Sequence, residues 1–310
     1  MIHALIVIAV IFIILAVAGL VAFKIGIIPK RVKKPDTDPR KIERSKIRKK
    51  NNDYLFSHNP EDISIKTPDG LTLTARFVPA EKESRRFVIC VHGYNCNGPD
   101  EFSHMFGFYH NTLGYNYFLP DLRGHGRSEG NRIGFGALDS KDILQWIGYL
   151  TDRFGSDIEI ILHGISMGAA TVMLVNESNP PEQVKLVIED CGFTCAYDEM
   201  ANTVKDILKF NFPFLVTLGN VWCRLLAGYD LKKDANPLAK MKDSKNPILF
   251  IHGDADTFVP YRMCGELYDA CKVDKDMLTV KGAVHAFSYY VAKDEYEAKV
   301  TEFISNHIGL

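Results

Sequence analysis

A five-residue turn at residues 164–168, which reads Gly-Ile-Ser-Met-Gly, constrains this chain more than any other stretch. An apolar, β-branched run at residues 158–162 precedes it, and a helix-forming run at residues 169–174 follows it. Gly-x-Ser-x-Gly between a strand and a helix is typical of a nucleophile elbow, in which the serine occupies a strained turn. The flanking glycines lack a Cβ and so let the strand and the helix cross closely. We therefore predict that Ser166 is a nucleophile at the edge of a sheet.

Residues 59–310 around this turn predict one catalytic domain of alternating strands and helices. Residues 63–66 and 71–77 alternate apolar and polar side chains around a Pro-Asp-Gly turn, which predicts a hairpin. Continuous apolar runs predict strands buried on both faces at residues 87–91, 115–119, 185–188, 248–251 and 277–280. Helical patterns fill residues 100–113, 137–154 and 295–308. This order predicts an α/β fold with a mostly parallel, doubly wound sheet and helices on both faces.

The segment at about residues 192–246 interrupts this alternation. It is rich in aromatic residues, and Pro213 and Gly219 divide it into short helical stretches. A structureless loop of that length is improbable in a compact domain, so we predict a helical cap inserted into the sheet. Packing on the sheet accounts for most of the aromatic side chains, and others are expected to line an apolar substrate pocket.

The N-terminus carries a long apolar stretch, because residues 4–23 contain no charged side chain. About twenty helical residues cross the ~30 Å hydrocarbon core of a bilayer, so residues 1–23 are predicted to be a transmembrane anchor. A cleaved signal peptide is the alternative, and Ala16-Val17-Ala18 matches its cleavage pattern. No Lys or Arg precedes the apolar stretch, however, and a signal peptide begins with a basic region. We therefore favour a retained, single-pass anchor.

A basic segment follows at residues 24–58. Residues 24–50 contain twelve Lys or Arg and only three acidic residues, which are Asp36, Asp38 and Glu43. Positive charge after the span predicts that the catalytic domain lies on the cytoplasmic side, with an outward orientation as the alternative. The segment also suits contact with anionic lipid headgroups. Pro29, Pro35 and Pro39 favour a solvated juxtamembrane linker.

The bulk composition excludes several other classes of protein. A net charge of −1 over 310 residues gives no general attraction to nucleic acid, so no nucleic-acid partner is expected. The seven cysteines form no C-x-x-C pair and predict reduced thiols. One of them, Cys96, lies in a loop near the predicted site. We do not favour it as the nucleophile, because the residues that a serine nucleophile needs are all present, as described below. We find neither a Gly-rich phosphate loop nor a cluster with metal-ligand spacing, so we expect no cofactor and no metal.

A serine nucleophile needs a base and an acid that orients the base, and in this strand order both should follow the serine. His285 lies in the loop after the strand at residues 277–280, so we assign it as the general base. Asp254 and Asp256 follow the strand at residues 248–251, and either can supply the acid. Side-chain chemistry alone favours Asp256 over Asp254 only modestly.

Two backbone N–H groups are predicted to form the oxyanion hole. Met167 begins the helix after Ser166, and Tyr94 lies in the turn after the strand at residues 87–91. The remaining strand-end histidines, His125, His163 and His252, are expected to be structural.

Five short motifs together resemble the α/β-hydrolase superfamily. They are His92-Gly93, Asp121-x-Arg123-Gly124-x-Gly126-x-Ser128, Gly164-x-Ser166-x-Gly168, His252-Gly253-x-x-Asp256-x-x-Val259-Pro260 and Gly282-x-x-His285. The match covers roughly residues 60–308 and is closest to the serine-aminopeptidase-like branch, which includes monoacylglycerol lipases and small carboxylesterases. The resemblance implies an eight-stranded sheet, no cofactor, and Asp256 as the catalytic acid.

These inferences predict a membrane-anchored serine hydrolase that forms an acyl-enzyme on Ser166. The anchor and the aromatic cap favour a carboxylic ester, including esters derived from lipids. A serine aminopeptidase acting on short peptides is the alternative enzyme, because the cap supplies Asp198, Glu199 and Asp206 for a free amino terminus. A catalytically silent, membrane-anchored binding protein on a hydrolase fold is the alternative of a different class.

Overall fold

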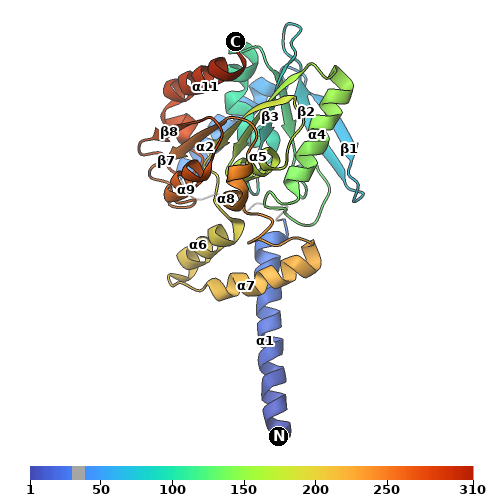
Figure 1. The fold of residues 1–310 in the computed structure, drawn as a ribbon, viewed down its shortest axis with the longest axis vertical. Coiled ribbons are helices and arrows are strands. Elements are labelled where there is room, and N and C mark those ends of the chain that lie inside the picture. Colours follow the sequence, from blue (N-terminus) through green and yellow to red (C-terminus); the bar gives the residue numbers. More distant parts are fainter. Residues whose placement is uncertain (30–38, 310) are drawn as a thin grey trace.

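The computed structural model describes residues 1–29 and 39–309 and is built around one eight-stranded sheet (Figure 1). The strands are β1 (Glu61–Lys66), β2 (Thr72–Val78), β3 (Arg86–Val91), β4 (Asn116–Pro120), β5 (Glu159–Ile165), β6 (Val184–Asp190), β7 (Ile248–Gly253) and β8 (Lys275–Val280). They lie in the order β1-β2-β4-β3-β5-β6-β7-β8. The pairs β1–β2 and β2–β4 are antiparallel, and the other pairs are parallel. The predicted α/β-hydrolase fold is therefore confirmed.

The burial of each strand follows its place in the sheet. β3, β4 and β5 lie in the middle and are buried along nearly their whole length, as expected for strands covered on both faces. β1 lies at an edge, where Ile63 is its one buried residue. Ile63 pairs with Ala75 and Lys66 pairs with Thr72, so the predicted hairpin is present.

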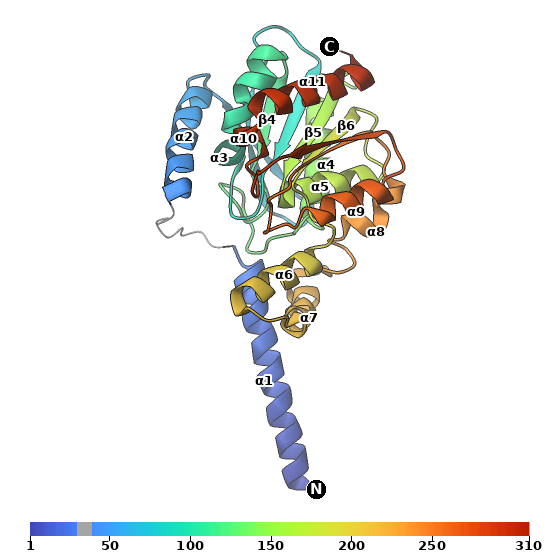
Figure 2. The same cartoon turned by 90° about the vertical axis from the view of Figure 1, so that its left-hand side faces the viewer.

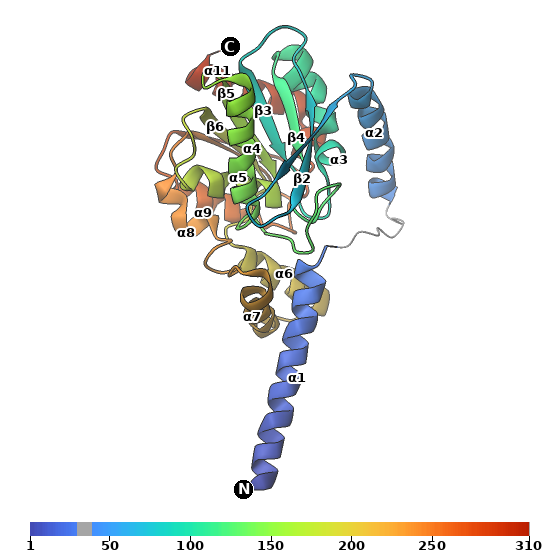
Figure 3. The same cartoon turned by 90° about the vertical axis from the view of Figure 1, so that its right-hand side faces the viewer.

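Helices cover both faces of the sheet, as Figures 2 and 3 show. The first face carries α4 (Asp139–Phe154), α5 (Met167–Glu177) and α9 (Arg262–Ala270). Trp146, Val172 and Leu267 place these helices in one core cluster. The second face carries α3 (Gly98–Phe102), α10 (Ser288–Val291) and α11 (Lys293–Ile308). Their side chains form a separate cluster, so the sheet divides the hydrophobic core in two.

The helix predicted at residues 100–113 is divided into three pieces. After α3 the chain forms a 3₁₀ turn, η1 (Ser103–Met105), and then a π-helical segment, η2 (Gly107–Thr112). α3 begins before Asp100 because the Asn97 side chain accepts a hydrogen bond from the Asp100 N–H at 3.0 Å. Gly107 stands where the winding changes, consistent with its low helix propensity.

Much of the basic segment predicted as a linker is helical. Helix α2 (Pro39–Phe56) occupies most of it, and Pro35 falls outside the described residues. Lys, Arg and Glu are good helix formers, and proline is tolerated at the first helical position. Near its end α2 docks on the domain, because Leu55 is fully buried and the Asn52 side chain donates to Asp100 at 2.9 Å.

The N-terminal helix α1 (Ile2–Ile27) is long and apolar enough to cross a membrane, by length and composition. It projects from the domain as a single shaft (Figure 1). It continues beyond the predicted span and ends before Pro29. Its last turns are part of the domain, because Phe23 and Ile27 are buried and the Ile27 carbonyl accepts from the Ile133 N–H at 2.8 Å.

The predicted cap is a helical insertion between β6 and β7. It contains α6 (Ala196–Leu208), α7 (Pro213–Trp222), the π-helical segment η3 (Cys223–Ala227), α8 (Pro237–Lys240) and the 3₁₀ turn η4 (Met241–Asp243). α6 and α7 lie between the sheet and the free part of α1 (Figures 1 and 2). α7 crosses α1, and the Trp222 indole N–H donates to the Ala16 carbonyl at 2.8 Å. The cap therefore joins the domain to the N-terminal helix.

Candidate active site

Ser166 occupies the turn between β5 and α5 with a φ of 58° and a ψ of −118°. A positive φ is costly for a non-glycine residue and is found mainly where function requires it. The flanking glycines make the turn sterically possible. A Cβ on Gly164 would lie 2.2 Å from the Gly168 carbonyl oxygen, and a Cβ on Gly168 would lie 1.8 Å from the Val91 carbonyl oxygen. The strand, the turn and the helix therefore have the geometry of a nucleophile elbow.

Two loops at the same sheet edge bring an imidazole and a carboxylate to Ser166. His285 follows β8, and its Nε2 lies 2.9 Å from the Ser166 hydroxyl. Its Nδ1 lies 2.7 Å from Oδ2 of Asp256, which follows β7. With Asp256 ionised, the network assigns the proton to Nδ1, so Nε2 can accept the Ser166 proton. The three side chains form one chain of hydrogen bonds from hydroxyl to carboxylate.

The Asp256 carboxylate is buried but fully supplied with donors. The backbone N–H groups of Phe258 and Val259 donate to its Oδ1 at 2.9 and 3.0 Å. Burial alone would raise the pKa of Asp256. The hydrogen bonds from His252 and His285 outweigh burial and lower that pKa to about 2. Asp256 is therefore an anion at neutral pH, as the orientation of His285 requires.

Asp254, the other acid considered from the sequence, has a different place. Its Oδ1 accepts a hydrogen bond from the Gly282 N–H at 2.6 Å. It is exposed, and it ties the loop after β7 to the loop that carries His285. Asp256 is the acid that contacts the His285 imidazole, whereas Asp254 holds the loop around it.

Two of the three histidines expected to be structural, His163 and His125, lie away from the Ser166–His285–Asp256 chain of hydrogen bonds and have structural contacts. His163 is fully buried between the hydroxyl groups of Tyr109 and Tyr296, at 2.8 and 2.9 Å, and burial lowers its pKa to about 3. The backbone N–H of Asn95 donates to His125, which thereby supports the loop containing Tyr94.

His252 contributes to the site, which the sequence did not indicate. Its Nε2 lies 3.0 Å from the Val259 carbonyl oxygen and 3.4 Å from Oδ2 of Asp256. Burial opposes its protonation, but contact with Asp256 prevails and raises the pKa of His252. The one available sequence signal is its position four residues before Asp256.

The segments predicted to supply oxyanion donors meet at Ser166. Met167 is the first residue of α5, where backbone N–H groups have no partner within the helix. On the other side, a Cβ placed on Gly93 would lie 3.3 Å from the Ser166 Cβ. Tyr94 follows directly, and its hydroxyl donates to the Gly26 carbonyl of α1 at 3.3 Å. The Tyr94 loop therefore joins the serine to the end of the N-terminal helix.

One cluster in the described part of the chain brings three metal-ligating atom types together. Cys191, Asp256 and His285 place theirs within 4.8 Å of one another. Two of these groups already hydrogen-bond each other, and burial raises the pKa of Cys191 well above its usual value. A protonated thiol is a poor metal ligand, so the donor set suits the serine chemistry better than a metal.

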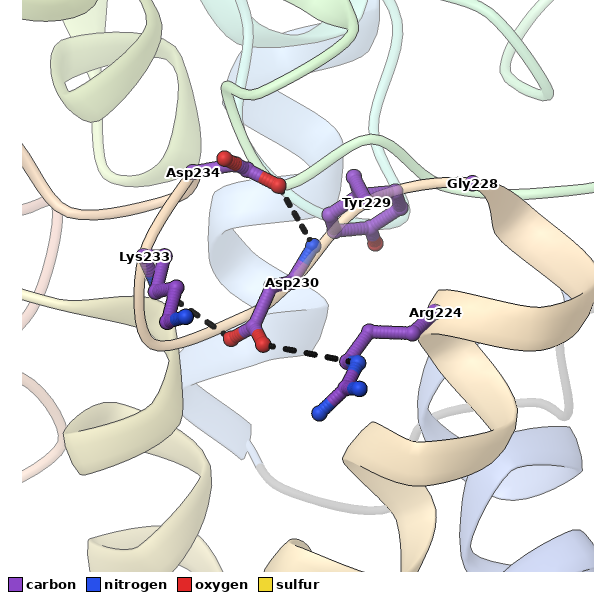
Figure 4. A pocket seen from close by; sticks show the side chains of 6 residues that line it. All are labelled: Arg224, Gly228, Tyr229, Asp230, Lys233 and Asp234. Carbon is purple, nitrogen blue, oxygen red and sulfur yellow. Dashed lines mark hydrogen bonds and ion pairs between the residues drawn. The ribbon is translucent and has the colours of Figure 1, made fainter.

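A separate hollow of about 260 Å³ lies in the cap, and its lining does not include Ser166, Asp256 or His285. Figure 4 shows that the Asp230 and Asp234 carboxylates bond to neighbouring groups of the same turn. The Asp230 carboxylate accepts from the Lys233 N–H at 3.2 Å and lies 3.8 Å from Arg224, while Asp234 accepts from the Asp230 N–H at 2.8 Å. The hollow therefore lies over a turn that is held by its own hydrogen bonds, and Ser166 is not part of its lining.

Comparison with known proteins places the chain in a family. The Bacillus subtilis uncharacterized protein YqkD is 26% identical over 227 residues, which are 73% of each chain. The Saccharomyces cerevisiae uncharacterized membrane protein YNL320W is 22% identical over 217 residues, which are 68% of each chain. Among solved structures, the Pyrococcus furiosus esterase Pf2001 superposes with a TM-score of 0.69 at 21% identity, covering 91% of this chain and 98% of the esterase. The sequence profile of the prolyl oligopeptidase family (Peptidase_S9) matches residues 101–310, which are more than half of the chain. The chain therefore belongs to the prolyl oligopeptidase family of α/β hydrolases.

Proposed function

We propose that the chain is a membrane-anchored serine hydrolase that cleaves a carboxylic ester through an acyl-enzyme on Ser166. The observation that carries the proposal is the continuous chain from the Ser166 hydroxyl through His285 to Asp256, at 2.9 and 2.7 Å. A hydroxyl becomes a useful nucleophile when a base lies within hydrogen-bond reach and an acid orients that base.

The geometry suggests the following sequence of steps. His285 Nε2 takes the proton of Ser166 as its Oγ attacks the ester carbonyl carbon. The N–H groups of Tyr94 and Met167 stabilise the oxyanion, and each such donor typically contributes roughly 3–4 kcal/mol. The protonated imidazole then gives its proton to the leaving alkoxide, which leaves an acyl group on Ser166. Water attacks that acyl group with His285 as base and releases the carboxylic acid.

The preference for esters rests on the cap and on the structural relative. The cap exposes many apolar side chains beside α1, and an apolar acyl chain suits such surroundings. Pf2001, which shares the fold, is described as an esterase. An ester of lipid origin is the substrate that we consider first.

Activity-based labelling tests the proposal directly. A fluorophosphonate probe should label the native protein, and Ser166→Ala should abolish the label. The native protein should hydrolyse p-nitrophenyl acyl esters, and Ser166→Ala should lose at least about 10³-fold in kcat. Cys96→Ala serves as the matched control and should keep both signals. Absence of Ser166-dependent labelling would favour the catalytically silent binding protein instead.

An aminopeptidase is the second candidate, and Glu199 in α6 favours it. Glu199 is 5% exposed, and its Oε2 has no hydrogen-bond partner among the described residues. Burial, with the nearby Asp256 carboxylate, raises the pKa of Glu199 to about 8. The ammonium of a peptide would supply the missing donor and favour the ionised form. If this candidate is correct, Glu199→Gln should abolish turnover of aminoacyl-amides and leave ester turnover intact.

Membrane attachment through α1 is also part of the proposal. The length and composition of α1 support a retained span, and the yeast relative is described as a membrane protein. Lys24 and the basic residues after it favour a cytoplasmic catalytic domain. Fusions at the C-terminus test this orientation. Green fluorescent protein should be bright and alkaline phosphatase inactive, and the reverse pattern would place the domain outside.

A further inference from the structure

Helix α7 contacts α1 well inside the apolar stretch rather than at its end. The Trp222 indole reaches the Ala16 carbonyl. A Cβ placed on Gly19 would lie 2.8 Å from the Leu218 carbonyl oxygen, and a Cβ on Gly219 would lie 3.3 Å from the Ala22 Cβ. The small residues on both helices allow this close crossing. The cap therefore occupies the same level along α1 as residues 16–22.

The length of α1 then sets where a bilayer can lie. Residues 1–14 are exposed all round, whereas contacts with the domain begin at residue 15. At 1.5 Å per residue, residues 1–14 span about 21 Å, which is less than the ~30 Å hydrocarbon core. The missing length lies in residues 15–23, beside the cap. The apolar part of α1 covers the whole hydrocarbon core when residues 15–23, at the level of α7, are included.

The outward side of the cap is rich in exposed apolar side chains, as expected for a surface at the edge of a bilayer. We call it the cap surface, and it is defined by the exposed apolar residues of α6, α7, η3 and the loop between α6 and α7: Ile207, Leu208, Phe210, Phe212, Phe214, Val221, Leu225 and Leu226. Their exposed fractions run from 38% for Leu226 to 72% for Ile207. Water-facing surfaces of soluble proteins rarely gather so many large apolar side chains.

The cap surface also has the orientation of an interfacial helix. α7 runs across α1, so a bilayer that α1 crosses would hold α7 roughly in its plane (Figure 1). Three exposed basic residues, Lys205, Lys209 and Arg224, lie among the apolar residues, and the exposed acids of the same elements are Asp198 and Asp206. Basic and aromatic side chains on such a helix suit the boundary between acyl chains and anionic headgroups.

We propose that the cap surface is embedded in the phospholipid bilayer that α1 crosses, with α7 lying in the membrane plane near the hydrocarbon edge. The proposal rests on α1 being the retained span proposed above. In this arrangement both α1 and the cap surface hold the protein in the membrane. The sheet edge that carries Ser166 faces this layer, because Tyr94, beside the serine, bonds to Gly26 at the end of α1.

Tryptophan fluorescence in vesicles tests the depth of the cap without any assay of activity. The full-length chain is reconstituted into two matched sets of phosphatidylcholine and phosphatidylglycerol vesicles, with acyl chains brominated near the headgroup to probe the cap or near the middle of the bilayer to probe α1. The chain has two tryptophans, Trp146 and Trp222, and Trp146 is buried in the domain. Bromolipid should remove a large part of the Trp222 emission, and the Trp222→Phe protein should lack that quenching.

Single tryptophans introduced at chosen positions in the Trp222→Phe protein provide matched controls. Phe214→Trp tests the cap surface, Phe12→Trp tests the free part of α1, and Phe56→Trp tests α2, which flanks the sheet away from the shaft of α1 (Figure 2). These phenylalanines are 46%, 72% and 40% exposed. We expect quenching at residues 214 and 12 and none at residue 56.

Three outcomes would overturn the proposal. Quenching at residue 12 without quenching at residue 214 would place the cap surface in water or against another protein. Equal quenching at residues 214 and 56 would show contact with lipid that is not specific to the cap. Absence of quenching at residue 12 would mean that α1 does not cross the bilayer, so the anchor would fail as well. Fluorophosphonate labelling of Ser166 is independent of all three, so failure of the hydrolase proposal remains distinguishable.

Discussion

At the scale of single residues, the site depends on how one carboxylate is held. Asp256 accepts two backbone N–H groups on Oδ1, and two imidazoles lie near its Oδ2. Its lowered pKa is also a contribution to stability. A depressed carboxylate pKa stabilises the fold above the unfolded pKa near 3.8, and this contribution is lost as the pH falls towards 2. It amounts to about 2 kcal/mol.

The two neighbouring aspartates should respond differently to amidation. Asp256→Asn should lower kcat about 10⁴-fold, because an amide favours the wrong His285 tautomer. Asp254→Asn keeps an oxygen that can accept from the Gly282 N–H, so its kcat should fall less than about tenfold. Steady-state kinetics on an ester that the native protein turns over measures both. Equal losses in the two variants would contradict the assignment of Asp256.

His252 is expected to act through Asp256 as a positioning residue. His252→Gln should lower kcat about tenfold and leave KM unchanged, because Asp256 loses a donor while the substrate loses no contact. The split between kcat and KM is the informative measurement. A lower melting temperature with an unchanged kcat would show that His252 only fills space.

At the scale of elements, helix α5 carries an unusual acid at its end. Glu177 is 9% exposed, and neither of its carboxylate oxygens has a hydrogen-bond partner among the described residues. Burial raises the pKa of Glu177 to about 9. The negative end of the helix dipole disfavours an anion at the same place. The helix is therefore less stable than its length and packing would allow.

Glu177→Gln should stabilise the protein in a pH-dependent way. An acid with a raised folded pKa costs stability progressively from its unfolded pKa, near 4.5, up to the folded value near 9. At pH 8 the substitution should therefore raise stability by about 1–3 kcal/mol. At pH 4 the gain should vanish, because both states are protonated there. Thermal unfolding in detergent at the two pH values measures the difference, and a gain independent of pH would contradict the mechanism.

The strands were predictable because burial on both faces leaves a continuous apolar run. The runs at residues 87–91 and 115–119 differ from β3 and β4 by at most one residue at each end. Helices α2 and α9 were not predicted, because α2 is too charged to suggest a packed face and α9 is short. The order of the loops indicated Ser166, His285 and an acid at residue 254 or 256, and the family resemblance then favoured Asp256. The roles of the three residues remain a proposal. The contact of His252 with Asp256 depends on how one loop curves, and the spacing of four residues between them does not by itself specify that curve.

At the scale of the whole molecule, the first half of α1 projects from the domain and its second half packs against the domain. Gly19 lies where α7 crosses, and its missing side chain sets the distance between the two helices. The sequence predicted the span but not this crossing, because it requires Gly19 and Trp222, about two hundred residues apart, to meet.

Gly19→Leu should weaken this junction without making α1 less apolar. The new side chain would meet the Leu218 backbone, so α1 and the cap must separate. We expect a loss of about 1–3 kcal/mol, measured as a lower melting temperature in detergent. Ala9→Leu is the matched control, because Ala9 is exposed on the same helix and should tolerate the change. Equal effects of the two substitutions would contradict a specific role for the crossing.

The bond between Tyr94 and Gly26 fixes the direction in which the catalytic edge faces. An enzyme held in this way searches for its substrate in two dimensions. For the membrane-anchored ester hydrolase proposed above, the rate should depend on the mole fraction of ester among the lipids and not on the amount of ester per volume of solution. Adding inert lipid while the amounts of enzyme and ester stay constant should slow turnover, because it lowers the mole fraction of ester in the membrane.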